Sequence, residues 1–190
     1  MDDTIIFFLN DNGAPLEANA GDNGPQKGGK ANVFEGGIHI PFMVEWKGHL
    51  TPGRVDRRPV ISLDIFPTAV ALAGAKIPAG KQIDGVNLLP YLTQKTEDLP
   101  HRVLFWRFGE QHAIHQGDWK LIEAGENITR LYDLKGDPAE KNNRAKDHPE
   151  MVKELHTELA RWLSELMPER WKHRADFIFV DGGDIFKGPY

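Results

Sequence analysis

The 190-residue chain contains no cysteine. This absence excludes a disulfide framework, a thiolate zinc site and a cysteine nucleophile within these residues. Serine is almost as scarce. Ser62 and Ser164 are the only two, and neither lies in the Gly-x-Ser-x-Gly pattern of a serine hydrolase. The sequence therefore offers no familiar nucleophile.

Long apolar runs and basic blocks are also missing. No apolar stretch approaches the roughly 18 residues that a membrane-spanning helix needs. The run Ile5–Leu9 follows an acidic start and is too short for a signal peptide. The 23 basic and 28 acidic residues are scattered, with a net charge of −5. We therefore expect neither a membrane nor a nucleic acid as a partner.

What is present predicts an α/β fold in the first part of the chain, residues 1–98. Thr4–Leu9 is a short apolar run of β-formers, typical of a strand buried on both faces of a parallel sheet. Residues 13–29 are predicted to form a glycine-rich loop, and a loop of this length is usually either functional or mobile. A second strand is predicted over residues 38–46, and a helix is predicted from a Ser62 cap to Gly74.

The pattern changes after the polar, proline-terminated linker at residues 93–100. Short strands separated by turn residues predict an antiparallel meander. These strands are 102–108, 113–116, 119–123 and 129–134. Asp147 and Glu150 resemble a capping box, and the helix after them places one apolar stripe against the sheet. The predicted division is therefore an α/β part (1–98), an antiparallel subdomain with a terminal helix (99–170) and an unassigned tail (171–190).

Asp11-Asn12-Gly13 directly follows the first strand and has two interpretations. Asn-Gly favours a tight turn on local grounds. Alternatively, ligands of open α/β sheets bind beyond the carboxyl ends of strands, where a carboxylate and an amide carbonyl suit calcium or magnesium. Calcium takes about 6–8 oxygen ligands, so this motif alone would bind it poorly.

Residues 24–31 come close to a nucleotide-binding P-loop. The spacing G-x-x-x-x-G-K is present, but Ala31 stands where a hydroxyl must bind magnesium, and no helix is predicted to follow. An ATP site is therefore disfavoured. Lys30 after two glycines still suits a fixed ammonium beside an anion, because glycine lets backbone N–H groups approach an oxyanion.

The histidines give no metal motif. His112 and His115 are three residues apart on a predicted strand, which places them on opposite faces. His39 lies within an apolar strand pattern and is interpreted as structural.

Taken in order, these segments resemble the C-terminal half of the type I sulfatases, the formylglycine-dependent sulfatases of the alkaline phosphatase superfamily. The resemblance covers residues 3–165. After the strand that ends in DNG, it is carried by GGKANVFEGGIHIPFMVEW, SLDIFPTAVALAGAKIP, DGVNLLPYL, GDWKLI and RLYDLKGDPAEKNN. It implies part of an alkaline-phosphatase-like sheet with helices, followed by a small antiparallel sheet and a C-terminal helix.

The same resemblance assigns roles to three residues. Asp11 and Asn12 match two calcium ligands, with magnesium as the other candidate ion, and Lys30 matches the lysine that contacts the sulfate oxygens. The family nucleophile is a formylglycine made from Cys or Ser in a C/S-x-P/A-x-R motif, which this chain lacks. We therefore expect the nucleophile in a missing N-terminal half, and no activity from this chain alone.

Several alternatives remain open on the sequence. One alternative hypothesis is a phosphoester or phosphonate hydrolase of the same superfamily, which the chain resembles less closely. Another is a non-catalytic protein, either a remnant or a subunit completed in trans. The expected partner is a small sulfate ester or a sulfated saccharide, with Trp106 and His112 as candidate contacts. Localisation cannot be read from these residues, although family resemblance favours the periplasm or secretion. An incomplete sheet around Ile5–Leu9 and residues 41–46 should expose apolar surface.

Overall fold

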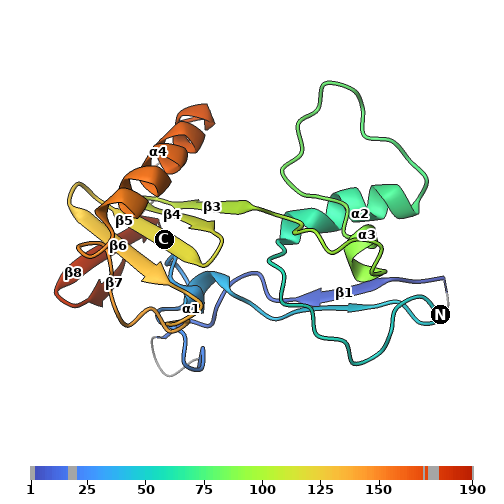
Figure 1. Ribbon diagram of the computed structural model, residues 1–190, viewed down its shortest axis with the longest axis horizontal. Helices are drawn as coiled ribbons and strands as arrows, with labels where there is room; N and C mark the ends of the chain where they lie inside the picture. The colour runs from blue at the N-terminus through green and yellow to red at the C-terminus, as the bar shows by residue number, and fades with distance from the viewer. Residues whose placement is uncertain (1–2, 17–20, 169, 171–175, 190) are drawn as a thin grey trace. The chain divides into compact units, whose positions relative to one another are not determined.

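The computed structural model describes residues 3–16, 21–168, 170 and 176–189 (Figure 1). The chain divides into two compact units. The first consists of Met1–Asn10 and Pro41–Arg102, and the second of Asp11–Ile40 and Val103–Tyr190. The segment 11–40 therefore packs with the C-terminal sheet, although it precedes the first unit's larger part in the chain. None of the described helices is long and apolar enough to cross a membrane.

In the first unit, β1(Ile6–Leu9) pairs antiparallel with β2(Phe42–Glu45). The prediction of a strand buried on both faces of a parallel sheet is not met within this chain. Phe8 is 61% exposed and lies opposite Met43, which is 54% exposed, and Ile6 on the same face is also exposed. Among the described residues, no further strand joins this ribbon, so the expected exposed apolar surface is present.

Asp64 is the centre of the first unit. Its side chain is fully buried and accepts the backbone N–H groups of Ile61 (2.9 Å) and Val86 (2.7 Å). His101 Nε2 lies 2.8 and 3.0 Å from its two carboxylate oxygens. Thr68 donates to the Asp64 carbonyl, and its hydroxyl accepts the N–H of Leu88. The segments SLDIFPT and DGVNLLP are therefore joined by buried polar contacts, and their role is structural.

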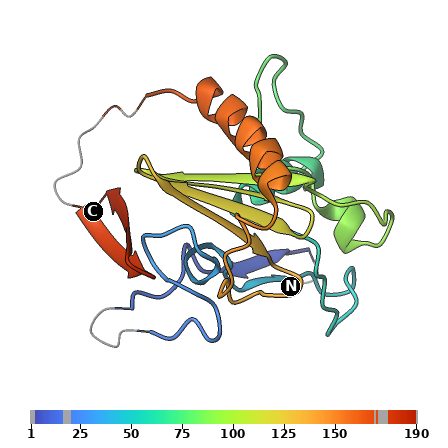
Figure 2. The same cartoon turned by 60° about the vertical axis from the view of Figure 1, so that its left-hand side comes forward.

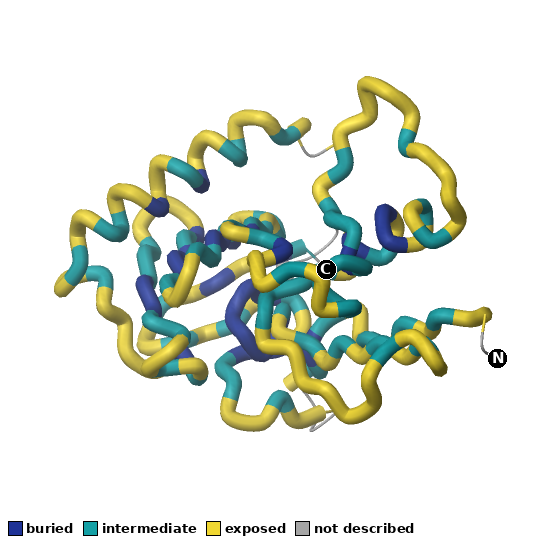
Figure 3. The backbone as a smooth tube through the Cα atoms, turned by 45° about the vertical axis from the view of Figure 1, so that its right-hand side comes forward, coloured by how far each residue is buried: buried dark blue, intermediate teal, exposed yellow. Residues whose placement is uncertain are grey.

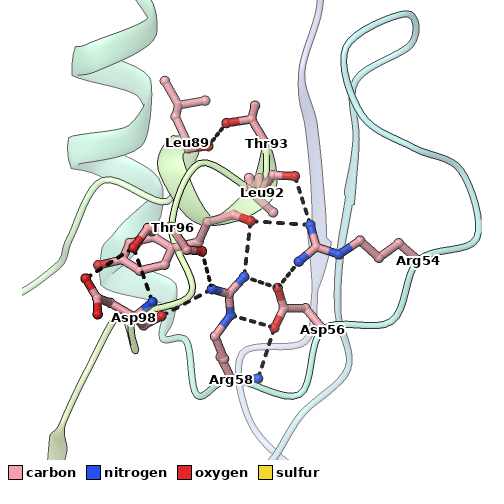
Figure 4. Close-up of polar contacts among 9 residues, drawn as sticks. Arg54, Asp56, Arg58, Leu89, Leu92, Thr93, Thr96 and Asp98 are labelled. Carbon is pink, nitrogen blue, oxygen red and sulfur yellow. Dashed lines mark hydrogen bonds and ion pairs between the residues drawn. The ribbon is translucent and has the colours of Figure 1, made fainter.

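A second polar cluster ties the loop after β2 to α3(Leu89–Leu92) (Figure 4). Asp56 pairs with Arg54 (2.9 Å) and Arg58 (2.6 Å), and these guanidinium groups also donate to carbonyl oxygens at the C-terminal end of α3. Arg58 lies 5.3 Å from the Tyr91 ring centroid. Hydrogen bonds from Arg58 hold the Asp56 carboxylate in its charged form and lower its pKa to about 2. Cations at a helix C-terminus are favourable, so this cluster caps α3.

The helix starts differ from the predictions. Ser62 begins a short 3-10 turn (Ser62–Asp64) ahead of α2(Ile65–Leu72), and the Asp64 side chain, not Ser62, accepts the free N–H before the turn. The helix α4(Pro149–Glu165) has no side-chain cap, so the expected capping box of Asp147 and Glu150 is not formed. Asp147 pairs instead with Arg144 at 3.2 Å.

The second unit contains the predicted meander. Its strands are β3(Val103–Phe108), β4(Gln111–Gln116), β5(Trp119–Ala124) and β6(Ile128–Asp133), paired in that order and antiparallel throughout. Helix α4 lies across one face of this sheet (Figure 2). Leu155 and Leu159 are fully buried there against Ile114, Leu121 and Leu131. The meander and the apolar stripe of its helix are therefore confirmed.

The opposite face of the sheet is covered by two segments. One contains α1(Glu35–Ile38) and the buried residues before it. The other is a hairpin of β7(Asp176–Asp181) and β8(Asp184–Pro189) within the tail that the sequence left unassigned. Phe34 and Phe186 are fully buried and meet Tyr132 and Ala113 of the sheet in one cluster. Of the residues that the structure describes, most buried ones belong to this unit. Buried residues are dark blue in Figure 3.

The Asp64→Asn variant tests the structural role of this carboxylate. An amide has one acceptor oxygen where the carboxylate has two, and its NH2 group would face a backbone N–H donor. We expect a loss of about 3 kcal/mol in the free energy of unfolding, measured by urea denaturation. The matched control, Asp84→Asn, changes an exposed carboxylate and should cost less than about 0.5 kcal/mol. Equal stability of the two variants would contradict the role assigned to Asp64.

Candidate functional site

Two loops of the second unit are held together by backbone hydrogen bonds. Gly13 N–H donates to the carbonyl of Gly37 (2.9 Å), and Lys30 N–H donates to the carbonyl of Ala14 (3.1 Å). The Asp11-Asn12-Gly13 turn is therefore strapped against the loop that contains Lys30. The backbone of the segment that carries Asp11 and Asn12 therefore lies against the backbone of the loop that carries Lys30.

The Asn23 side chain also joins the two loops by hydrogen bonds, and the sequence did not predict this role. Its side-chain oxygen accepts the N–H of Ala14 (2.8 Å), and its NH2 group donates to the carbonyls of Ala14 and Gly28 (both 3.0 Å). One amide side chain thus pairs with the backbone of both loops. An Asn in a glycine-rich stretch is the only sequence signal for it, and that signal is also typical of ordinary turns.

Glycine is needed here for close backbone contact. A Cβ atom on Gly13 would lie 1.7 Å from the carbonyl oxygen of Gly36, and one on Gly36 would lie 2.2 Å from that of Gly28. No side chain fits at these distances. In the P-loop-like motif, a Cβ atom on Gly29 would lie 2.4 Å from the Ala14 carbonyl oxygen, whereas one on Gly24 would meet nothing within 4 Å, so only Gly29 of this pair is required by loop packing.

Lys30 stands at the surface of this buried loop. Its side chain is exposed, while Gly28, Gly29 and the segment Asn32–Gly37 are buried. Within the described part of the chain, the Lys30 side chain has no hydrogen-bond or ion-pair partner. The lysine is thus a free ammonium on a firmly packed base, the arrangement that suits an anionic ligand.

The turn after Lys30 is held in an unusual conformation. Ala31 has φ +69°, in the left-handed region that non-glycine residues rarely adopt. The buried side chain of Gln111 donates to the Ala31 carbonyl and accepts the Val33 N–H, both at 3.3 Å. These contacts join the turn to β4 and fix the direction of the chain beyond Lys30.

Asp11 and Asn12 supply hard oxygen donors next to this loop. Asp11 is exposed, and its Oδ1 accepts the Asn12 N–H at 3.0 Å. Asn12 donates to the Gly13 carbonyl at 2.8 Å. A carboxylate and an amide fit calcium or magnesium chemically. Among the described residues, no group of three or more His, Asp or Glu side chains could hold a metal ion, so this pair would form only part of a coordination shell.

A buried ion triad lies beneath the loop. Lys120 of β5 is fully buried, with its Nζ 2.7 Å from Glu35 and 2.8 Å from Glu140. Glu140 also accepts the backbone N–H of Glu35 at 2.6 Å, and its own backbone has φ +53°. These contacts connect the sheet, α1 and the turn after β6. A lysine buried without such partners would be very costly, so the triad forms as a unit.

The two carboxylates of the triad differ in pKa. Burial acts to raise the pKa of Glu35, but Lys120 and the His39 side chain, 2.9 Å away, outweigh it and lower the pKa to about 2. Burial raises the pKa of Glu140, and Lys120 offsets this only in part. The hydrogen bond that the His39 ring donates to the Glu35 carboxylate raises the pKa of His39 in turn. His39 lies at the exposed end of the triad, directly after α1, and not within the strand predicted over residues 38–46, since β2 begins at Phe42.

The two candidate substrate contacts lie on different faces of the sheet. Trp106 packs with the cluster around Phe34, on the face that carries the Lys30 loop. His112 lies on the α4 face, beside a depression that Glu123 and His156 also line. His115 lies on the opposite face from His112, paired with Lys120 of β5, and burial lowers its pKa. The structure thus groups Trp106 but not His112 with Lys30.

Comparisons with known proteins agree on one family. Residues 29–167 match the family model described as "N-sulphoglucosamine sulphohydrolase, C-terminal". The chain is 40% identical to human N-acetylgalactosamine-6-sulfatase over 144 residues, covering 70% of this chain and 27% of that protein. It is 31% identical to the N-acetylgalactosamine-6-O-sulfatase of Bacteroides thetaiotaomicron, over 81% of this chain and 35% of that protein.

A solved structure shows the same relationship. The crystal structure of Ps i-CgsB in complex with k-i-k-neocarrahexaose superposes with a TM-score of 0.75 at 29% identity. The match covers 85% of this chain and 36% of that one. The chain spans about a third of the length of these relatives.

The Lys120→Met variant tests the buried triad. Methionine fills a similar volume but leaves the buried Glu140 without a cation and Glu35 with His39 alone, so the free energy of unfolding at pH 7 should fall by about 3–5 kcal/mol. In the wild type, the low pKa of Glu35 stabilises the fold above about pH 4.3, and this contribution is lost as the pH falls towards 2. In the variant, burial raises the pKa of both carboxylates, so protonation should reduce the deficit between pH 7 and pH 5.

Urea denaturation at both pH values measures this difference. Lys146→Met, at an exposed lysine of the same unit, is the matched control and should change stability by less than about 0.5 kcal/mol. A deficit in Lys120→Met that grows as the pH falls would contradict the account.

Proposed function

Because this chain belongs to the sulfatases of the alkaline phosphatase superfamily, as their C-terminal portion, we propose that it supplies Lys30, Asp11 and Asn12 to a site that hydrolyses sulfate esters. The observation that carries this proposal is the strapping of the two loops by the Gly13–Gly37 and Ala14–Lys30 hydrogen bonds. These bonds hold the backbone of the segment with the two oxygen-donor residues against the backbone of the loop with Lys30. An anionic group held by a cation on one side and a lysine on the other is consistent with that arrangement.

Lys30 is proposed to bind the sulfuryl oxygens. Its ammonium would donate hydrogen bonds to them and offset the negative charge that moves as the S–O bond to the leaving group breaks. The fixed loop matters for this role, because a preorganised charge needs little reorganisation during the reaction. The buried glycines and the Gln111 contacts provide that fixed base.

Asp11 and Asn12 are proposed to hold calcium, with magnesium as the alternative. When bound, such an ion acts as a Lewis acid and a template for the sulfate group. The two residues fit as part of a shell, and the remaining ligands would come from outside this sequence.

The nucleophile is also proposed to come from outside this sequence. There is no cysteine in the chain, Ser62 opens a 3-10 turn, and Ser164 Oγ donates to the Arg161 carbonyl within α4. A formylglycine in the N-terminal part of the enzyme would supply the attacking hydrate. We therefore propose that the chain alone does not turn over sulfate esters.

The substrate class is proposed to be a sulfated saccharide. The relatives named above include sulfatases of N-acetylgalactosamine, and Ps i-CgsB was crystallised with an oligosaccharide. Trp106, on the same face as the Lys30 loop, is the candidate for sugar contact within this chain.

Binding of inorganic sulfate tests the role of Lys30. NMR titration of the isolated chain should shift the signals of residues 28–31, and the affinity should fall with added sodium chloride because the site is exposed. Lys30→Met should weaken binding about tenfold, since a charge-assisted hydrogen bond is lost. Lys146→Met is the matched control and should bind like the wild type. Equal sulfate affinity in Lys30→Met and the wild type would contradict the proposal.

Calcium titration tests the partial metal site. With only two ligand residues, we expect the melting temperature to rise by less than about 2 °C in 1 mM calcium, because stabilisation depends on the ion concentration relative to Kd. A rise above about 4 °C that Asp11→Asn abolishes would mean that this chain holds a complete site, contrary to the proposal.

A further inference from the structure

The β7–β8 hairpin contacts the loop that carries Lys30, although it lies beyond residues 29–167, the part that matches the family model. Lys27 Nζ pairs with Asp181 Oδ2 at 2.9 Å, and the two side chains are only 17% and 25% exposed. The same ammonium lies 5.5 Å from the Phe34 ring centroid and 5.6 Å from that of Tyr132. Two rings and a carboxylate therefore surround this cation.

Lys27 is also part of the loop's backbone packing. Its carbonyl accepts the Gly36 N–H at 2.7 Å, and it precedes Lys30 by three residues. Contacts that fix the Lys27 side chain therefore also restrict the movement of the turn that carries Lys30. Lys27 itself has its charge satisfied within the protein, whereas Lys30 extends to the surface.

Aromatic packing holds the hairpin in the same place. Phe186 of β8 is fully buried, with its ring centroid 4.9 Å from that of Phe34, and Phe179 of β7 is 5.4 Å from Phe34. Both pairs have edge-to-face geometry, which is favourable for aromatic rings. Phe34 lies directly before α1, so the hairpin covers the base of the loop.

Arg130 of β6 fixes the other side of the hairpin. Its Nη2 pairs with Asp184 at 2.5 Å and donates to the Asp181 carbonyl at 3.3 Å. The hairpin turn is therefore attached to the sheet, and its Asp181 carboxylate is attached to the loop. The hairpin is thus bonded to the sheet through Arg130 and to the loop through Asp181.

We propose that the β7–β8 hairpin is a positioning element for the Lys30 loop, and that Lys27 and Asp181 are its positioning residues. This inference rests on the proposed function for its consequence, because sulfate affinity should depend on the fixed position of Lys30. The hold of the hairpin on the loop is a separate claim and can be measured without any ligand.

Hydrogen–deuterium exchange of the full chain tests that hold. Asp181→Asn removes the ion pair without changing the side-chain volume, and amide exchange in residues 24–37 should become about tenfold faster. Exchange in β5 should stay at the wild-type rate, which a general loss of stability would not allow. Asp181→Glu keeps the charge and should restore most of the protection.

A double variant separates the pair from general effects. Lys27→Met keeps the apolar stem against the two rings, and the Lys27→Met/Asp181→Asn double variant should exchange no faster than the more affected single variant. The matched control is Asp118→Asn, which removes the exposed 3.8 Å pair with Lys135 and should leave residues 24–37 unchanged. Phe186→Ala tests the aromatic contact in the same way.

Sulfate titration of the same variants completes the test. Asp181→Asn should weaken sulfate binding about threefold to tenfold by loosening Lys30. Unchanged exchange of residues 24–37 in both Asp181→Asn and Phe186→Ala would overturn the proposal. Faster exchange with unchanged sulfate affinity would overturn the positioning of Lys30. If Lys30→Met and the wild type bind sulfate equally, the proposed function fails, while the exchange data still decide whether the hairpin holds the loop.

Discussion

The candidate site depends on the burial of one lysine. The Lys120 side chain is fully buried inside the second unit, and its contacts with Glu35 and Glu140 make that burial tolerable. Each partner comes from a different segment: Glu35 opens α1, and Glu140 lies in the turn after β6 with its backbone in the left-handed region. Three of the segments that carry the sulfatase resemblance therefore meet at one point. The loop with Lys30 lies on the segment that this triad holds in place.

This arrangement divides the recognisable residues into structural and chemical ones. Asp64, Thr68 and Leu88 join two motifs within the first unit, and the Lys120 triad joins three within the second. The glycines of the loops permit backbone contact. Asp11, Asn12 and Lys30 remain, at the surface of this framework. Most residues of the motifs that identify the family therefore make structural contacts. Chemical roles are proposed only for the few side chains that lie outside these contacts.

Local patterns in the sequence were sufficient for the C-terminal sheet. Short strands with Gly117-Asp118 and similar turns predicted the meander, and the spacing of Leu155 and Leu159 predicted the face of α4 that is buried. Both depend on neighbouring residues, so periodicity reveals them. The antiparallel pairing of β1 with β2 joins segments about thirty residues apart, and nothing in either segment specifies its partner. The hairpin at residues 176–189 was left unassigned because its glycines weaken the strand pattern.

The contrast between local patterns and contacts of distant segments also explains which residues of the candidate site the sequence revealed. Asp11, Asn12 and Lys30 were assigned to the site through the resemblance and stay a prediction, since a turn motif and a lone lysine are uninformative alone. Lys120 was missed, although it had a signal: a charge between Trp119 and Leu121, on the face that Ile122 and Ala124 also occupy. A lysine at a buried strand position requires a carboxylate, but the sequence does not say which one. Gln111 and Asn23 were missed because their partners are backbone groups. Every residue has such groups, so the sequence does not indicate which of them will be bonded.

The most direct measurement is a high-resolution crystal structure of the chain grown with sulfate. The account predicts a sulfate ion within hydrogen-bond distance of Lys30 Nζ, on a loop strapped to Ala14, with Lys120 enclosed between Glu35 and Glu140. A sulfate bound only at other cations, or a Lys120 side chain directed into solvent, would contradict it.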